Sequence, residues 1–224
     1  MAPIPENDCS KVLPLQFYNK PVVLVAFELI GCLLCHRTPA GVISGRIVET
    51  EAYMGLNDPA SHAFAGPTGR ARVFWQGPGI AYVYLIYGVH LCFNVITSSG
   101  EDVGGVLVRA LEPVQGVSLM KQNRGIDDIS RLTDGPGKIT RALKITLADN
   151  GRDVTAGNLI IARFRPPSRV CLTPRIGITR AKEAPLRFFD SDSTFISRPE
   201  TPCVFSGTKS EVKVFIRHMK PTLS

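Results

Sequence analysis

Apolar and polar positions alternate most clearly between residues 80 and 98, around the stretch YVYLIYGVHLCFN. An alternation with a period of two predicts strands, and Gly88 in its middle predicts the turn between them. We therefore expect a β-hairpin over 80–98. Its turn is unusual, because Ile86, Tyr87 and Val89 stand where hairpin turns normally carry polar residues.

The same kind of pattern predicts elements on both sides of this hairpin. An apolar run over 21–30 begins with Pro21, which suits a first helical turn, and is followed by Gly31, which suits a C-terminal cap, so it predicts a short buried helix. A Thr-Pro-Ala-Gly turn joins two predicted strands at 32–37 and 42–50. Further along we expect a strand at 105–110, helices at 114–123 and 135–145, and short strands at 158–164, 169–172 and 194–197.

Three segments lack a clear period. Residues 54–79 are rich in Gly, Pro and Ala and are longer than an ordinary connection, which predicts a functional loop. Residues 1–18 are expected to be a loose N-terminal arm, and 199–224 a basic extension of unknown role. The domain itself is expected to span 19–198, and the pattern alone indicates a mixed fold with several hairpins.

Composition adds little to this prediction of fold and function. The chain has 224 residues, of which 44% are apolar, enough for one sizeable core, and its 20 glycines and 17 prolines predict many turns. A net charge of +7 favours an anionic partner such as nucleic acid, although many basic proteins bind none. The run over 21–30 contains Glu28 and is too short to span a bilayer, so we expect a soluble, intracellular protein with no membrane partner.

The six cysteines are scattered through a chain long enough to fold without disulfides, so reduced thiols are expected. Cys32-Leu-Leu-Cys35-His36 matches the haem-attachment pattern, but no distal ligand is recognisable, and the apolar Leu-Leu suits a buried strand. A structural zinc site would need a second Cys/His pair at ligand spacing, which the sequence lacks.

The candidate chemistry lies around VETEAY. Residues two apart in a strand share a face, so Glu49 and Glu51 are expected to project together, either as ordinary solvent-facing charges or as a functional pair. His62 follows in the loop over 54–79, and with Glu51 and Tyr53 it could form a general-base site or a metal site. The metal site is the weaker reading, because only one histidine is nearby.

Arg109 lies in the apolar strand GGVLVRALEP. Burying a lone guanidinium is costly unless it meets a carboxylate, a phosphate or a bound ligand. A salt bridge to a structural glutamate and a ligand contact both remain open from this pattern.

Seven motifs, RIVETEAY, ASHAF, YVYLIYG, CFN, VRALEP, GPGK and PRIGI, follow one another across residues 20–198. In this order and at these spacings they closely resemble the alkyladenine (3-methyladenine) DNA glycosylase family. The resemblance implies a single α+β domain, with a curved, mostly antiparallel, open-barrel-like sheet surrounded by helices and a protruding β-hairpin. It also implies an enzyme of base excision repair, which flips damaged purines out of double-stranded DNA and hydrolyses their N-glycosidic bond.

The resemblance assigns catalysis to two side chains. Glu51 matches the general base that activates a water for attack on C1′ of the sugar, and Arg109 matches a residue that holds this water. The backbone carbonyl of Ile176 matches its third contact. Glu49 is left with a supporting role.

The remaining matches concern the base and the DNA. Asn94 matches the side chain that obstructs the 2-amino group of normal guanine, and Tyr87 matches the wedge inserted into the base stack. The pocket wall is matched by Tyr53, His62 and Tyr84. Basic residues expected to contact phosphates are Arg70, Arg72, Lys138 and Arg175.

The family further implies a monofunctional enzyme that needs no metal or other cofactor, and we expect it to act as a monomer. Expected substrates are 3-methyladenine, 7-methylguanine, hypoxanthine and ethenoadenine. Ala65, Ala71 and Trp75 depart from the family pattern and His90 lies beside the wedge without an assigned role, which leaves the preferred base open. Two other readings are a non-catalytic nucleic-acid binder and a metal-dependent hydrolase using Glu49, Glu51, Asp58 and His62.

Overall fold

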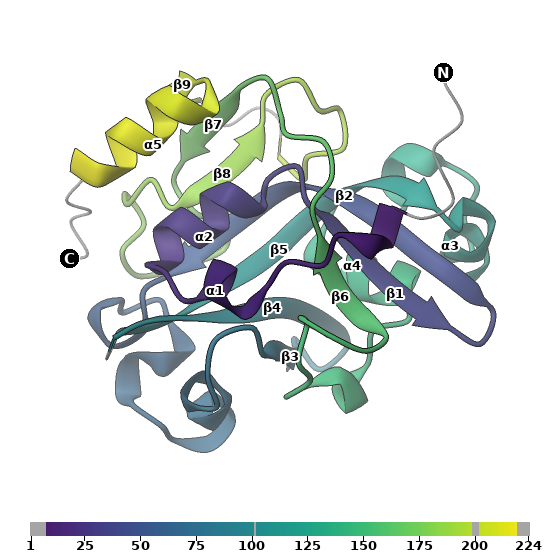
Figure 1. The fold of residues 1–224 in the computed structure, drawn as a ribbon, viewed down its shortest axis with the longest axis horizontal. Coiled ribbons are helices and arrows are strands. Elements are labelled where there is room, and N and C mark those ends of the chain that lie inside the picture. The colour runs from purple at the N-terminus through teal and green to yellow at the C-terminus, as the bar shows by residue number, and fades with distance from the viewer. Residues whose placement is uncertain (1–7, 101, 199–201, 219–224) are drawn as a thin grey trace.

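Strand β2 (Gly41–Tyr53) runs through the middle of the sheet and organises it (Figure 1). The computed structural model describes residues 8–100, 102–198 and 202–218. Along one edge, β2 pairs with β5 (Asp102–Gln115); along the other it pairs first with β1 (Leu33–Thr38) and then with β8 (Arg187–Asp190). All three pairings are antiparallel, so the middle of β2 is enclosed by neighbouring strands.

The other strands extend this centre outward in the order β3-β4-β5-β2-β8-β7-β9, with β1 and β6 branching from β2. Within the described residues this nine-stranded antiparallel sheet does not close into a barrel. The strands not yet given bounds are β3 (Ala81–Ile86), β4 (His90–Ser99), β6 (Leu159–Ala162), β7 (Val170–Thr173) and β9 (Phe205–Gly207). The predicted α+β class with an open antiparallel sheet is confirmed.

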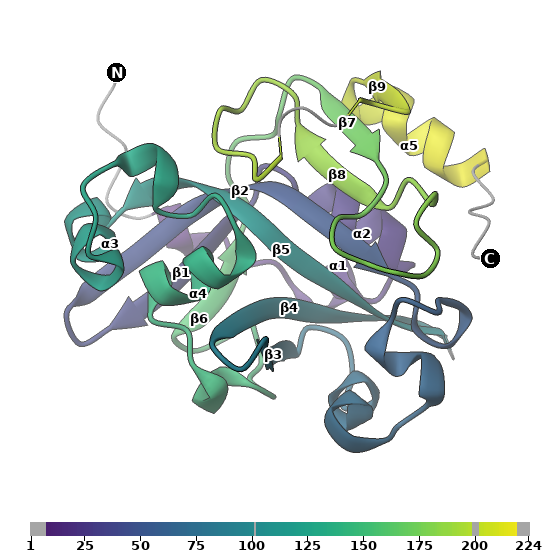
Figure 2. The same cartoon turned by 180° about the vertical axis from the view of Figure 1, so that it is seen from behind.

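Helices cover both faces of the sheet. The apolar α2 (Val22–Leu29) packs on β2 and β5 in front in Figure 1, and α4 (Pro136–Leu143) packs on β4 and β5 from the other side, seen in Figure 2. The remaining helices are α1 (Leu15–Tyr18) and α5 (Lys209–His218), which contact α2, and α3 (Val117–Arg124), which contacts α4. None of the helices in the described parts of the chain has the length and apolar character needed to cross a membrane.

Most elements predicted from the periodic pattern are present: the helix over 21–30 is α2, the two predicted hairpins are β1–β2 and β3–β4, and the helix over 135–145 is α4. The predicted strand over 105–110 is longer, because β5 continues to Gln115 and the following helix begins only at Val117. The segment 54–79 carries three short 3-10 helices, Gly55–Asn57, His62–Ala65 and Gly69–Trp75.

The prediction of a strand at 194–197 is wrong, and β8 (Arg187–Asp190) was missed. Its sequence RFFD begins and ends with charges, so it does not read as a buried strand. Both charges are nevertheless buried, because Arg187 pairs with Glu49 and Asp190 with Arg46.

The described part of the N-terminal segment is not a loose arm. Leu13 and Tyr18 are fully buried, and the Leu13 N–H donates a hydrogen bond to the carbonyl of Ile161 at 2.8 Å. Residues 1–7 lie outside the described residues, as do 199–201 and 219–224 of the predicted extension. Where the extension is described, it adds β9 and α5 to the fold.

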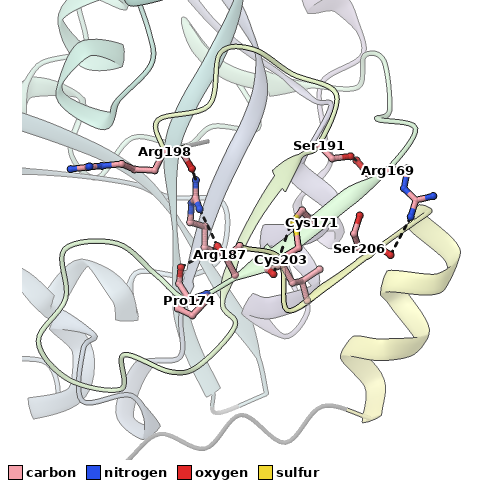
Figure 3. Close-up of a disulfide and its surroundings, with 10 residues drawn as sticks. Arg169, Cys171, Pro174, Arg187, Ser191, Arg198, Cys203 and Ser206 are labelled. Carbon is pink, nitrogen blue, oxygen red and sulfur yellow. Dashed lines mark hydrogen bonds between the residues drawn. A yellow bond between two sulfur atoms is a disulfide. The ribbon is translucent and has the colours of Figure 1, made fainter. Parts of the chain in front are cut away.

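The expectation of reduced thiols is wrong for four of the six cysteines. Disulfides join Cys9 to Cys35 and Cys171 to Cys203; the second ties β7 to the segment before β9 (Figure 3). Neither pairing was foreseeable, because each joins segments that only the fold brings together. Haem attachment through Cys32 and Cys35 would need both thiols to be free, and Cys35 is bonded to Cys9.

Candidate active site

A cleft of about 1350 Å³ opens on the side of the sheet covered by α4, between the β3–β4 hairpin and the loop that follows β7. Its walls bring together eight of the predicted site residues: Tyr53, His62, Tyr84, Tyr87, Asn94, Arg109, Lys138 and Ile176. Glu51 itself has no exposed surface and lies directly behind this wall, in contact with three of its members.

A register shift between Glu49 and Thr50 in the β2–β5 pairing shapes the cleft floor. Glu49 pairs with Ala110 and Thr50 pairs with Val108, so Arg109 is the extra residue of a β-bulge in β5. Bulges next to active sites commonly re-aim a side chain. Here the bulge leaves the Arg109 guanidinium between Glu49 and Glu51, with Nε 3.2 Å from Glu49 Oε1 and Nη1 3.3 Å from Glu51 Oε2. The predicted shared face of the two glutamates is therefore present, while the alternative of solvent-facing charges is wrong, since both are fully buried.

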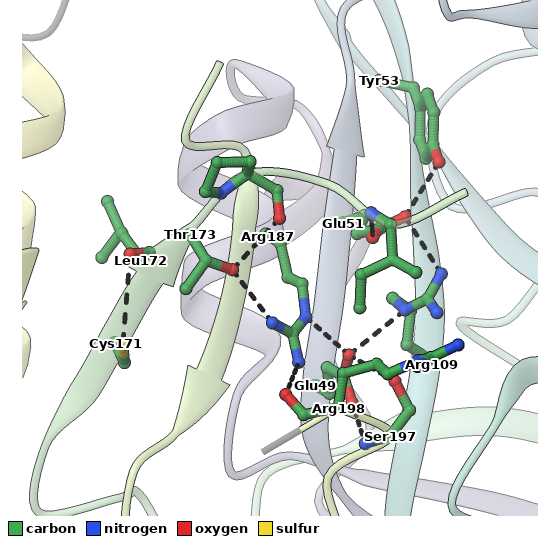
Figure 4. A network of polar contacts seen from close by, with 12 residues as sticks. Glu49, Glu51, Tyr53, Arg109, Cys171, Leu172, Thr173, Arg187, Ser197 and Arg198 are labelled. Carbon is green, nitrogen blue, oxygen red and sulfur yellow. Dashed lines mark hydrogen bonds and ion pairs between the residues drawn. The ribbon is translucent and has the colours of Figure 1, made fainter. Parts of the chain in front are cut away.

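Glu51 accepts hydrogen bonds on both carboxylate oxygens (Figure 4). Its Oε2 accepts from the Tyr53 hydroxyl at 2.8 Å as well as from Arg109, and its Oε1 accepts from the Ile176 N–H at 2.7 Å. Burial first, and then the neighbouring Glu51, raise the pKa of Tyr53 well above its ordinary value, so this hydroxyl keeps its proton and donates a hydrogen bond to Glu51.

Glu49 is held by a different set of partners. Its Oε1 accepts from Arg187 Nε at 2.7 Å and from the Ser197 hydroxyl at 2.8 Å, and its Oε2 accepts from the Ser197 N–H at 2.6 Å. Burial alone would lower the pKa of Arg109, but Glu51 and Glu49 raise it above the ordinary value. Arg109 is therefore a permanent cation shared by two buried carboxylates, of which Glu49 accepts four hydrogen bonds and Glu51 three.

Aromatic rings form one wall of the cleft. Tyr84 stacks on Tyr82, with ring centroids 5.0 Å apart, and meets the His62 ring edge-on at 4.6 Å. His62 Nδ1 is hydrogen-bonded to the Tyr82 hydroxyl at 2.8 Å, so Tyr82 fixes the pocket histidine. Burial, followed by the charge of Arg70, lowers the pKa of His62, which favours the neutral imidazole.

The hairpin tip is exposed and apolar. Tyr87 is 81% and Val89 73% exposed, and Tyr87 has a φ of 53°, in the left-handed region that bulky residues rarely adopt. Behind the tip, a Cβ on Gly137 would lie 3.0 Å from the Cβ of His90, so the glycine allows α4 to support the hairpin closely. This explains the place of His90, whose role the sequence left open.

The predicted phosphate contacts fall into two groups. Arg70 and Arg72 are exposed on the 3-10 helix Gly69–Trp75, and Lys138 lies on the cleft with Nζ 2.7 Å from Asp134 Oδ2. Arg175 was predicted wrongly, because its guanidinium is buried and bonded to both oxygens of Asp58. A guanidinium enclosed in this way cannot reach the DNA backbone.

Sequence reasoning also missed cations that line the cleft: Arg124, Arg141, Lys144 and Arg180. Arg141 and Lys144 lie at the end of α4, while Arg124 ends α3 and Arg180 belongs to the loop after β7, so only the fold reveals that they share one groove. Burial, and then the nearby Arg141, lower the pKa of Arg124, which marks a locally positive region beside α4.

The residues of the metal-site reading do not form a cluster suited to a metal ion within the described ranges. Asp58 is engaged by Arg175, and Glu49 by Arg109, Arg187 and Ser197. These carboxylates already have cationic partners, which weakens the reading of a metal-dependent hydrolase.

Comparisons with known proteins agree with the motifs. The family model described as "Methylpurine-DNA glycosylase (MPG)" matches residues 16–194. A protein of Methanoculleus marisnigri is 47% identical over 191 residues, covering 83% of this chain and 98% of that protein. Proteins of Carboxydothermus hydrogenoformans and Rhodopseudomonas palustris are each 42% identical, covering 84% and 88% of this chain and 99% and 96% of their own length. All three carry the name "Putative 3-methyladenine DNA glycosylase".

Proposed function

This chain belongs to the methylpurine-DNA glycosylase family, as its motifs predicted, and from that premise we propose that it excises alkylated and deaminated purines from double-stranded DNA with Glu51 as the general base. The observation that carries the proposal is the position of Glu51. It is a buried carboxylate fixed by three donors, Tyr53, Arg109 and Ile176, which all line one cleft.

A carboxylate offers about four acceptor positions, and three of those on Glu51 are filled by protein donors. Because Glu51 has no exposed surface, we propose that a small movement of the cleft wall admits a water to the remaining position. Glu51 then takes a proton from this water as the water oxygen bonds to C1′ of the sugar. At the same time the C1′–N bond breaks and the purine leaves with the bonding electrons. Arg109 and the Ile176 carbonyl would hold the same water.

The aromatic wall suits a flipped purine. Tyr84 offers a ring face for stacking, and His62, whose Nδ1 is bonded to the Tyr82 hydroxyl, keeps Nε2 for one hydrogen bond to the base edge. The Asn94 side chain is fixed because Nδ2 donates to the Tyr82 carbonyl at 3.1 Å, which supports its role as a rigid obstacle to the 2-amino group of guanine. The expected bases are 3-methyladenine, 7-methylguanine, hypoxanthine and ethenoadenine.

The DNA itself would follow the open side of the cleft. Tyr87 projects from the hairpin and can fill the gap that the flipped nucleotide leaves in the stack. Phosphates would be contacted by the exposed or cleft-lining cations Arg70, Arg72, Arg124, Lys138, Arg141, Lys144 and Arg180.

We further propose that the enzyme lacks a strand-cleaving step. Such a step needs a neutral lysine to form a Schiff base with the sugar. Lys138 Nζ donates to both oxygens of Asp134, at 2.8 and 2.7 Å, and is therefore engaged by this carboxylate rather than free to attack the sugar. The product should therefore be an intact strand with an abasic site.

The test uses a duplex with one hypoxanthine, with and without excess EDTA, and compares wild type with Glu51→Gln and with Glu112→Gln. General-base catalysis typically contributes roughly 10²–10⁴-fold, so Glu51→Gln should lose that much of the single-turnover rate. Glu112→Gln is the matched control, because it removes a carboxylate from β5 outside the cleft.

Each alternative has its own outcome. No base release by the wild type contradicts the glycosylase proposal and favours a non-catalytic binder. Release that stops in EDTA favours the metal-dependent hydrolase. Full activity of Glu51→Gln removes Glu51 as the base, and strand cleavage without added alkali contradicts the monofunctional mechanism.

A further inference from the structure

Two loops that border the cleft are joined by one buried ion pair, Asp58–Arg175. Arg175 Nη1 lies 2.5 Å from Asp58 Oδ2 and Nη2 lies 3.0 Å from Oδ1, so the contact is bidentate, and neither side chain is exposed. Asp58 belongs to the loop over 54–79 that carries His62, and Arg175 belongs to the loop over 174–186 that carries Ile176. The pair therefore links the base pocket to the segment beside Glu51.

On the Asp58 side, the carboxylate also organises its own loop. Its Oδ2 accepts a hydrogen bond from the Met54 N–H and its Oδ1 accepts one from the Ala60 N–H, each at 3.0 Å. These two contacts fix the loop between the end of β2 and the turn that precedes His62. A change at Asp58 thus acts on the backbone that places this histidine.

On the Arg175 side, the guanidinium reaches back to the end of β2. Nη1 donates to the Ala52 carbonyl at 3.0 Å, and the guanidinium carbon lies 4.7 Å from the centroid of the Tyr53 ring. The next residue, Ile176, donates its N–H to Glu51. Two of the three donors on Glu51, Tyr53 and Ile176, are consequently held by Arg175.

Stability alone gives a poor reason for this arrangement. A buried ion pair contributes little net stability, because desolvation offsets the attraction, and an apolar pair of the same volume often serves as well. Arg175 Nε is moreover buried without a hydrogen-bond partner in the described part of the chain, which is a further cost. Such costs are typical of groups retained to fix the geometry of a functional site.

We propose that Asp58 and Arg175 are positioning residues for base excision, which lock the loop over 54–79 to the loop over 174–186 and so hold Tyr53 and Ile176 against Glu51. The inference rests on the proposed role of Glu51 as general base. Because a donor shifted by about 1 Å can cost roughly 10²-fold in rate, the effect should be on the chemical step. Lesion affinity should change little, since phosphate contacts supply much of it.

The test compares Asp58→Asn and Arg175→Lys with a matched control, Asp190→Asn. The control breaks the Arg46–Asp190 pair, which is also buried but lies outside the cleft. Measurements are the urea unfolding midpoint, the dissociation constant for a hypoxanthine duplex, and the single-turnover excision rate at saturating enzyme. We expect both cleft variants to lose at least about tenfold in rate with nearly unchanged affinity, and Asp190→Asn to lose stability but keep the rate.

A double variant separates positioning from general loosening. If the pair acts through Glu51, adding Asp58→Asn to Glu51→Gln should not lower the residual rate further, because coupled residues are non-additive. A wild-type rate in Asp58→Asn, or a fully additive loss in the double variant, overturns the inference. If Asp58→Asn does not fold, Arg175→Lys decides in the same way, because it keeps the charge and loses the fork that reaches Ala52.

The two proposals fail differently. A wild-type rate in Glu51→Gln contradicts the general base itself. An inactive Glu51→Gln together with a fully active Asp58→Asn contradicts only the positioning pair.

Discussion

The floor of the cleft and the tip of the hairpin have opposite surroundings. On the floor, Glu49 and Glu51 are fully buried and each is bound by several donors. At the tip, Tyr87 is 81% exposed and also adopts a left-handed backbone conformation. The charged groups of the floor are thus shielded from water, whereas the aromatic ring of Tyr87 is exposed to it.

The difference indicates where each region gains its stabilisation. The floor is stabilised within the protein, because a buried charge is tolerated only with close partners, and this makes the floor rigid. The tip gains little from the protein and can be stabilised only by an apolar partner from outside, such as the bases of a DNA stack. Changes on the floor should therefore affect folding and chemistry together, whereas loss of the aromatic ring at the tip should affect DNA distortion alone.

The largest effect on stability is expected on the floor, from Glu49→Gln. This variant leaves Arg109 and Arg187 buried with one carboxylate fewer between them, and breaking a buried pair typically costs about 3–5 kcal/mol. The free energy of unfolding from urea titration should fall by that amount, and excision should weaken because Arg109 loses a partner. Glu112→Gln is the control: it removes a partly exposed partner of Arg46, which keeps Asp190. A loss in Glu49→Gln no larger than in the control would contradict the rigid floor.

A moderate effect is expected at the tip, from Tyr87→Ala. Alanine keeps the left-handed backbone of Tyr87, so this exposed substitution should change stability by no more than about 0.5 kcal/mol, but removal of the ring removes the substitute for lost stacking. Flipping of ethenoadenine, followed by its fluorescence, should weaken by about tenfold, or roughly 1.4 kcal/mol. Val89→Ala, two residues away, should have a smaller effect. Unchanged flipping in Tyr87→Ala would contradict the wedge.

Glycine at the same position separates the ring from its backbone. A non-glycine residue in the left-handed region costs roughly 1–2 kcal/mol, which glycine avoids. Tyr87→Gly should therefore be more stable than Tyr87→Ala while flipping equally poorly. Equal stability of the two variants would mean that the tip carries no backbone strain.

The two regions also differ in how well the sequence foretold them. The hairpin followed from alternation and Gly88, because strand period and turn residues are local signals. On the floor, the same alternation placed Glu49 and Glu51 on one face, but Arg187 and Ser197 come from parts of the chain whose strands were misplaced. The roles of Glu51, Arg109 and Tyr87 came from the family resemblance and stay predictions until tested.

Arg175 shows why part of the site was mispredicted. In the sequence it is one of many arginines, and only the fold brings Asp58 beside it. The same holds for the disulfides of Cys9 and Cys171, whose partners become neighbours only after the sheet has formed. Contacts between segments distant in the sequence leave no periodic pattern, so single-sequence reasoning cannot detect them.

The smallest effect concerns His62, on the aromatic wall that leads from the floor toward the tip. Burial and the charge of Arg70 lower its pKa in the folded protein, so the unfolded chain binds the proton more readily. Below the unfolded value of about 6.5, stability should fall as the pH drops toward the lower folded pKa, and it should be fully present above that window. The urea midpoint of the wild type should thus decline more between neutral and mildly acidic pH than that of His62→Gln. Arg70→Gln, which removes the second cause, should lie between them. A parallel decline in all three proteins would show that the wall around Tyr82 and Tyr84 does not disfavour the charged imidazole, and that the aromatic wall behaves like the open tip rather than like the floor.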